Sequence, residues 1–154
     1  MFLGLSVGSE NDLVFGSMLE ANLATEVGMI VLDMVGLYMS TFTEQLSANH
    51  GANPLMKKMF DINLYFLQVP QSETLLKHVF AMWRCIITKF PSVLFDGSAD
   101  YCSRLTFELL RCCNSKLSST RHESTALLYL LMRGNFEYTQ RKGITRVHLQ
   151  VRGY

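Results

Sequence analysis

The chain contains the stretch SETLLKHVFAMWRCIITKFP at residues 72–91, and this stretch decides its fold class. Its apolar residues recur at steps of three and four, the spacing that places side chains on one face of an α-helix. The helix is expected to begin after Ser72, and Pro91 ends it because a proline inside a helix clashes with the preceding turn. The buried face is expected to consist of Leu75, Leu76, Val79, Phe80, Trp83, Ile86, Ile87 and Phe90.

Two helices of the same kind are predicted before this stretch. Asn22 is expected to cap the first, and the turn-forming residues 47–53 end it. Pro54 suits the first position of the second, and Pro70 ends it. The expected core positions are Leu23, Val27, Ile30, Val31, Met34, Leu37 and Tyr38 in the first helix and Leu55, Met59, Ile62, Phe66 and Val69 in the second.

Two more helices are predicted after it. Ser98 is expected to cap the fourth helix of the chain. Thr120 followed by Glu123 has the spacing of a capping box for the fifth, and Gly134 is the expected stop. The inner faces would consist of Cys102, Leu105, Leu109, Leu110 and Cys113 in the fourth helix and Ala126, Leu127, Leu130 and Leu131 in the fifth.

The spacing of these helices indicates how they are arranged. Alternate helices repeat at roughly 45 residues, the period of HEAT and armadillo units. The predicted fold class is therefore all-α, an armadillo-like α-solenoid segment of about five helices over residues 19–151, although a compact helical bundle would give similar hydropathy. Residues 1–18 are expected to form a loop or a partial element. Residues 144–151 would begin a sixth, aborted helix before an atypical tail at 152–154.

Composition places the chain among globular proteins. It has 154 residues, of which 49% are hydrophobic and 18% charged, so a disordered chain is excluded. Charge is unevenly distributed: residues 1–56 contain no Lys or Arg, whereas residues 111–154 contain eight basic and two acidic residues. This polarity would steer an acidic partner toward the C-terminal half, unless it is only an ordinary solvated surface.

No group of residues has the types and spacing expected of a catalytic, cofactor-binding or metal-binding site. Motifs for a nucleophile or a phosphate-binding loop are absent from the sequence. The histidines and cysteines show no spacing that would close a zinc site, and adjacent Cys112 and Cys113 point about 100° apart on a helix, so at most one faces the core. These residues are His50, His78, His122, His148, Cys85, Cys102, Cys112 and Cys113.

The expected localisation is cytoplasmic. The N-terminus lacks the basic and apolar regions of a secretory signal. The most apolar run, residues 28–39, is interrupted by Asp33 and is shorter than the ~20 residues of a transmembrane helix. Aromatic residues beside the basic ones are few, so we expect no nucleic-acid partner.

Several strings resemble one protein family. The strongest is Ser124-Thr-Ala-Leu-Leu-Tyr-Leu-Leu-Met-Arg-Gly-Asn-Phe-Glu-Tyr138, followed by Arg146-Val-His-Leu-Gln150. This run resembles the zizimin-type branch of the DOCK (dedicator of cytokinesis) family, in which a similar run leads into the DOCKER domain. Shorter matches lie at residues 22–27, 89–95 and 109–112.

The resemblance implies a scaffold segment of a Rho-family guanine-nucleotide exchange factor. GTPases of the Rac or cell-division-control type would be partners of the full-length protein, a homodimer is compatible with it, and membrane recruitment would also belong to the full-length protein. No catalytic residue is carried over, because the exchange motifs of the family have no match here, and no cofactor is implied. The sequence departs from the family after Val151, which suggests a truncated form. The alternative is a stand-alone helical-repeat interaction module unconnected with nucleotide exchange.

Overall fold

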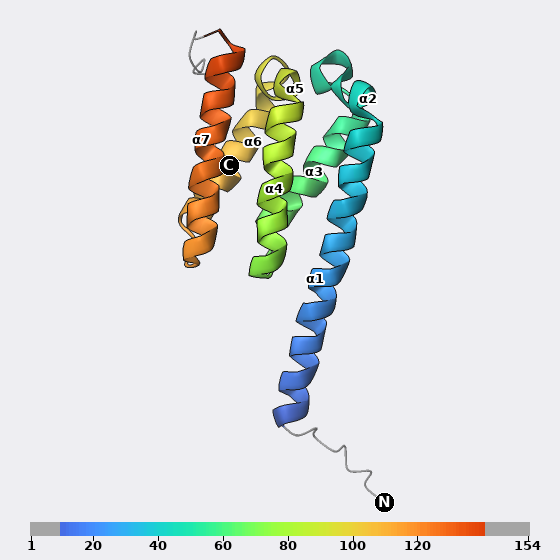
Figure 1. Cartoon of the computed structure of the whole chain (residues 1–154), viewed down its shortest axis with the longest axis vertical. Helices are drawn as coiled ribbons and strands as arrows, with labels where there is room; N and C mark the ends of the chain where they lie inside the picture. Colours follow the sequence, from blue (N-terminus) through green and yellow to red (C-terminus); the bar gives the residue numbers. More distant parts are fainter. Residues whose placement is uncertain (1–9, 141–154) are drawn as a thin grey trace, which may run out of the picture.

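The computed structural model describes residues 10–140, and it is helical throughout this part of the chain (Figure 1). Helix covers 87% of these residues, and no strand occurs among them, so the predicted all-α class is confirmed. The helices are α1 (Glu10–Thr41), α2 (Thr43–Ser47), the 3₁₀ turn η1 (Ala48–Gly51), α3 (Pro54–Gln68), α4 (Glu73–Lys89), α5 (Pro91–Phe95), α6 (Ala99–Cys113) and α7 (Ser118–Tyr138).

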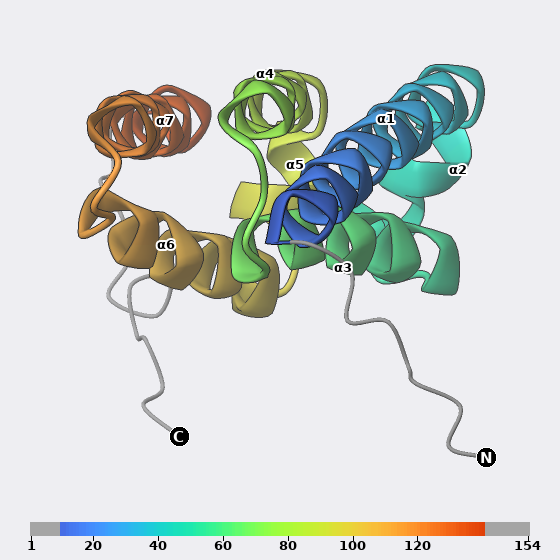
Figure 2. The ribbon, with the colours of Figure 1, turned by 90° about the horizontal axis from the view of Figure 1, so that it is seen from below.

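The helices form two layers. Figure 2 shows α1, α4 and α7 side by side in one layer, with α3, α5 and α6 in the other. Helix α4 is central in its layer, because it packs against α1 on one side and α7 on the other. Helix α6 packs against α7 and α3 against α4, so sequence neighbours form hairpins across the layers. This order is compatible with a repeat segment, and the solenoid itself stays a prediction.

The core lies between the layers and is centred on α4. Trp83 has 0% exposure, which confirms its predicted burial. Its ring meets that of Phe60 of α3 edge to face, with the ring centroids 5.1 Å apart. The Phe60 ring also contacts Tyr101 of α6, at a centroid distance of 4.7 Å. Aromatic contacts of this kind add to the free energy gained from the buried area. Three helices are thus joined through one aromatic cluster.

Three predicted helix starts are confirmed by their caps. Asn53 accepts a hydrogen bond from the Met56 amide at 2.8 Å, with Pro54 at the first helical position of α3. Ser72 caps α4 and Ser98 caps α6 through the same kind of bond. These caps depend on side chains within three residues of the helix start, which is why the sequence reveals them.

Helix α1 starts earlier than predicted. It begins at Glu10, so Asn22 lies inside the helix, and the predicted cap there is wrong. Glu10 and Asp12 occupy the first turn, where acidic side chains interact favourably with the helix dipole. The part of residues 1–18 that the structure describes is therefore continuous with the long helix rather than a loop.

The predicted core face of α1 is also wrong. Leu23, Ile30 and Leu37 are 61–62% exposed, and the other predicted positions on this helix are exposed too. The buried residues are Gly28, Leu32, Val35 and Met39. Gly28 accounts for which face of α1 packs on α4, because a Cβ at this position would come within 2.4 Å of Leu75 on α4. Glycine allows the two helices to approach, and the apolar stripe is left outside.

Two features of α7 differ from prediction. The capping box is wrong: α7 begins at Ser118, buried Thr120 lies in its first turn, and Glu123 pairs with Arg84 of α4. The stop at Gly134 is wrong as well, since α7 continues to Tyr138. A Cβ at Gly134 would make an ordinary contact with the Phe95 ring at 3.4 Å, so Gly134 lies where α7 faces α5.

Smaller corrections concern α5 and individual core positions. Pro91 ends α4 as predicted, but it also begins the short helix α5, which the sequence analysis missed. Leu55, Ile62 and Leu110 were expected inside and are exposed. The predicted sixth helix at residues 144–151 and the tail at 152–154 lie outside the described residues.

Candidate functional site

Polar and nucleophilic residues do not gather at one place. His50, His78 and His122 are exposed on three separate elements, and His148 lies outside the described residues. His50 Nδ1 is 3.3 Å from a carboxylate oxygen of Asp96, at the surface. Within residues 10–140, no group of three or more His, Cys, Asp and Glu residues is placed to hold a metal ion.

The four cysteines are all free and differ in exposure. Cys102 and Cys112 are buried, Cys113 is half-buried and Cys85 is exposed. Only one of the adjacent pair is fully buried, as predicted, but it is Cys112, so the prediction that Cys113 lies on the inner face is wrong. Burial raises the pKa of the Cys102 thiol, because the thiolate would lose its hydration. The same cause raises the pKa of Cys112, opposed in part by Arg111.

We expect a thiol-reactive dye to label Cys85 first and Cys102 last. Reaction requires an accessible thiolate, which Cys85 offers at the surface and Cys102 does not. The two rates should differ by about tenfold or more under native conditions. Peptide mapping by mass spectrometry measures both rates, and denatured protein, in which both sites are accessible, is the control. Equal rates in the native protein would contradict the burial of Cys102.

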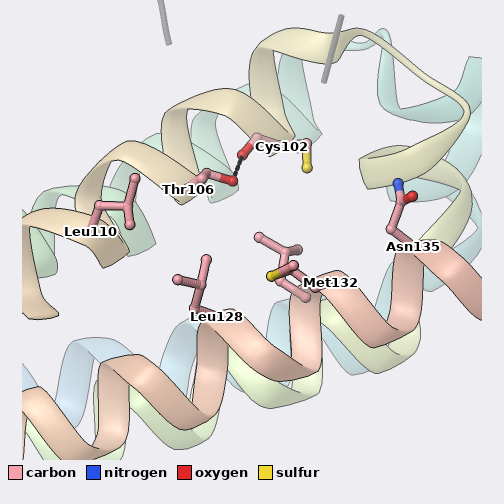
Figure 3. Close-up of a pocket in the computed structure, with 7 residues that line it drawn as sticks. Cys102, Thr106, Leu110, Leu128, Met132 and Asn135 are labelled. Atoms are coloured by element: carbon pink, nitrogen blue, oxygen red, sulfur yellow. Dashed lines mark hydrogen bonds between the residues drawn. The ribbon is translucent and has the colours of Figure 1, made fainter. Parts of the chain in front are cut away.

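A pocket lies between α6 and α7 (Figure 3). Its volume is about 180 Å³. The lining is almost entirely apolar, and the two helices contribute opposite walls: Cys102, Thr106, Leu110, Leu128, Leu131, Met132 and Asn135. Thr106 donates its hydroxyl hydrogen to the Cys102 carbonyl at 2.8 Å, so this hydroxyl is already engaged.

Asn135 is the unusual member of this lining. It is 2% exposed, and neither its amide nitrogen nor its amide oxygen has a hydrogen-bond partner among residues 10–140. A buried amide without partners is costly, and most native proteins satisfy such groups with another residue, a water or a ligand. The sequence analysis did not single out Asn135, because its burial depends on how α5, α6 and α7 meet.

Exposed apolar side chains surround this pocket. We call them, together with the pocket, the α6–α7 surface; they are Phe107, Leu110, Tyr129, Met132 and Phe136. Tyr129 is 66% exposed and the others are about half exposed. A cluster of large apolar side chains at one edge of a small protein is typical of an interaction surface.

The basic residues near this surface make local contacts. Arg111 donates to the Leu67 carbonyl at 2.7 Å and pairs with Glu108 at 2.9 Å. Arg121 donates to two backbone carbonyls just before α7. These arginines remain exposed at their ends. They therefore give the α6–α7 surface a basic border while also fixing the loop between its helices.

A second apolar surface lies on α1. We call it the α1 outer face; its members recur at steps of three and four on the side away from α4: Leu19, Leu23, Val27, Ile30, Met34 and Leu37. All six are at least half exposed. The helix is also long and apolar enough to cross a membrane by length and composition, with a mean hydropathy of 1.4 over 18 residues, a test that core helices of soluble proteins also pass.

Comparison with known proteins gives matches over most of the chain. Dedicator of cytokinesis protein 9 from Homo sapiens is 55% identical over 143 residues, or 93% of this chain. Dedicator of cytokinesis protein 11 from Danio rerio is 50% identical over the same share, and dedicator of cytokinesis protein 7 from Mus musculus is 33% identical. The chain spans about 6–7% of the length of these relatives. No model of a known protein family and no solved structure matches it.

Proposed function

Because this chain belongs to the dedicator-of-cytokinesis family, as a segment similar to the zizimin-type members, we propose that it is a scaffold segment of a Rho-family guanine-nucleotide exchange factor. The observation that carries the proposal is 55% identity to dedicator of cytokinesis protein 9 across 93% of the chain. A helical segment with a continuous core suits a scaffold, because it holds neighbouring parts of a long chain at a fixed separation.

In this proposal the exchange surface lies elsewhere in the full-length protein. The chain corresponds to about 7% of the length of that relative, which leaves ample room for other domains. Exchange requires a surface that binds the nucleotide-free GTPase more tightly than the loaded one. Some of the polar residues serve structural contacts, such as the cap of Ser72, the interhelical pair of Arg84 with Glu123 and the loop contacts of Arg121.

The full-length protein would act on GTPases of the Rac or cell-division-control type and would be cytoplasmic, with recruitment to membranes. These assignments follow from the zizimin-type resemblance. The higher identity to dedicator of cytokinesis proteins 9 and 11 than to protein 7 supports that branch.

We expect the isolated chain not to accelerate release of a fluorescent GDP analogue from Rac-type or cell-division-control-type GTPases. Release is followed by fluorescence with the chain in stoichiometric excess, and magnesium chelation serves as the positive control. A rate within about twofold of the GTPase alone is expected. A tenfold rise, equivalent to ~1.4 kcal/mol of barrier, would place an exchange surface within this chain.

The second candidate is a stand-alone interaction module that binds an acidic partner. It is favoured by the border of Arg111 and Arg121 beside the α6–α7 surface. Binding of an acidic polypeptide that weakens steeply with salt, and that is lost when both arginines are replaced by glutamine, would favour this module.

A further inference from the structure

We propose that the bond between Asp96 and Gly97 is a site of spontaneous isomerisation, and that isoaspartate formed there separates the end of α7 from η1. In this reaction the Gly97 amide nitrogen attacks the side-chain carboxyl carbon of Asp96, water leaves, and a cyclic imide forms. Hydrolysis of the imide at the original main-chain carbonyl leaves Gly97 joined to the former side-chain carbon. The water that leaves is replaced at hydrolysis, so no other reactant is needed. This inference goes beyond the scaffold role and does not depend on it.

Asp96 differs from the other aspartates of the chain in its sequence and its position. It is the only aspartate followed by glycine, and no asparagine is followed by glycine. A glycine leaves its amide nitrogen unhindered, because it has no side chain. Asp96 lies in the turn after α5, and its side chain is 57% exposed, so water reaches it. The four other aspartates lie within helices, where hydrogen bonds hold the backbone: Asp12, Asp33, Asp61 and Asp100.

Asp96 also lies where three elements meet. Its carboxylate is 3.3 Å from His50 Nδ1 on η1. Partial burial raises the pKa of the Tyr138 hydroxyl at the end of α7, and the neighbouring Asp96 carboxylate raises this pKa further. The Tyr138 ring contacts that of Phe95 at a centroid distance of 5.9 Å. Figure 1 shows α5, the turn after α2 and the end of α7 at the same end of the molecule. The Asp96 carboxylate therefore joins η1 to α7.

Isoaspartate would not fit at this position. A Cβ at Gly97 would lie 2.4 Å from the His50 carbonyl oxygen and 2.7 Å from that of Val93, so the backbone of Gly97 is closely packed. Isomerisation adds one main-chain carbon just before Gly97 and shortens the side chain by one carbon. The longer main chain has no space beside His50. The shorter carboxylate is drawn back from both His50 and Tyr138.

The η1 turn depends on this contact more than an ordinary turn would. Asn49 and His50 have φ values of 52° and 53°, left-handed values that residues other than glycine adopt at a cost in free energy. Such a conformation persists only where neighbouring residues hold it. Gly97 packs against it, and Tyr101 donates its hydroxyl hydrogen to the Gly51 carbonyl at 3.1 Å. We therefore expect isomerisation to loosen η1 as well as the end of α7.

The test is storage of the full chain at neutral pH and body temperature, followed by peptide mapping with fragmentation that distinguishes the two linkages. Isoaspartate should accumulate at position 96 at least about tenfold faster than at any of the four aspartates within helices, because helical backbone opens rarely. Asp96→Glu should abolish the reaction at this position, since its longer side chain would have to close a larger and less favourable ring. Circular dichroism checks that the variant keeps the parent's helix content.

Asparagine at the same position gives a faster measurement with a matched control. An amide is a better electrophile than an ionised carboxylate, so Asp96→Asn should form the same imide with loss of ammonia. The product gains the mass difference between an amide and an acid, which mass spectrometry records directly. Asp100→Asn makes the same change within α6, before Tyr101, and should keep its amide over the same period.

Hydrogen exchange measures the structural consequence. The isomerised chain is separated from the parent by ion-exchange chromatography, so that both are compared in the folded state. Amides of residues 48–51 and 136–139 should exchange at least about tenfold faster in the isomerised chain, because both segments lose contacts with Asp96. Amides around Trp83 in α4 should be unchanged and serve as the internal reference.

Three outcomes would overturn the proposal. One is a native chain in which no isoaspartate forms at position 96 within the time that converts the urea-unfolded chain, since packing around Gly97 would then prevent the reaction. Another is loss of the amide from Asp100→Asn as fast as from Asp96→Asn. The third is an isomerised chain whose exchange at the end of α7 equals that of the parent, which would show that Asp96 does not join α7 to η1.

Discussion

Replacement of Trp83 by alanine is expected to lower the free energy of unfolding by about 3–5 kcal/mol. The side chain has 0% exposure and meets Phe60 edge to face at 5.1 Å, so its removal leaves a cavity at the centre of the core and ends an aromatic contact. Urea unfolding followed by circular dichroism measures the change, with the midpoint and slope compared between variant and parent.

Trp83→Phe is the matched control for this variant. It keeps an aromatic ring and removes the indole nitrogen, which is buried and has no hydrogen-bond partner within the described residues 10–140. The loss should therefore be clearly smaller than for alanine. If Trp83→Ala unfolds at the same urea concentration as the parent, the core is not centred on α4.

Replacement of Gly28 by leucine is expected to destabilise the contact between α1 and α4 by about 1–3 kcal/mol. A Cβ at this position would already lie 2.4 Å from Leu75 Cδ2, and Leu75 is itself buried. Rotation of Leu75 could make room for a methyl group, but a leucine side chain needs more space in a close-packed contact, so we expect the helices to separate. The same urea titration measures the loss.

Gly16→Leu on the same helix is the control for the helix-forming effect of the substitution. A Cβ there meets nothing within 4 Å, so leucine should stabilise α1 by up to about 1 kcal/mol relative to glycine. If leucine lowers the free energy of unfolding at position 28 and raises it at position 16, the close approach at Gly28 is the cause of the destabilisation. Stabilisation at both would show that α1 does not pack on α4 through this residue.

The sequence predicts helices well where their limits depend on local residues. Asn53, Ser72 and Ser98 cap the helices that follow them, and Pro91 ends α4, because each acts within a turn of its own position. The capping box predicted at Thr120 does not form, because a contact between two helices involves its glutamate. Glu123 pairs with Arg84 on α4, and that partner is far away in sequence.

The face that a helix buries is predicted less well, and α1 shows why. Its apolar stripe has the expected spacing, yet the stripe is exposed, and the face that contains Gly28, Leu32, Val35 and Met39 is buried instead. Periodicity identifies an apolar face without specifying its partner. Helix α4 has one apolar face and a central position, so the face that periodicity identifies is also the face that is buried.

The pocket between α6 and α7 could not be predicted from the sequence. Cys102 and Asn135 lie more than thirty residues apart and become neighbours only because the two helices form a hairpin. The isolation of Asn135 from hydrogen-bond partners depends on the packing of α5 as well. The exposure of Leu110 is likewise a property of the helix pair and was missed for that reason.

The projection of α1 beyond the other helices has a mechanical consequence (Figure 1). Thr25 bonds to Ser72 at 2.9 Å, and the side chains of residues 10–24 are nearly all exposed. At 1.5 Å per residue this part of the helix is a stiff rod about 22 Å long. A tilt of about 10° where α1 contacts α4 would move Glu10 by about 4 Å. A small change in packing near Thr25 would therefore produce a larger displacement at Glu10.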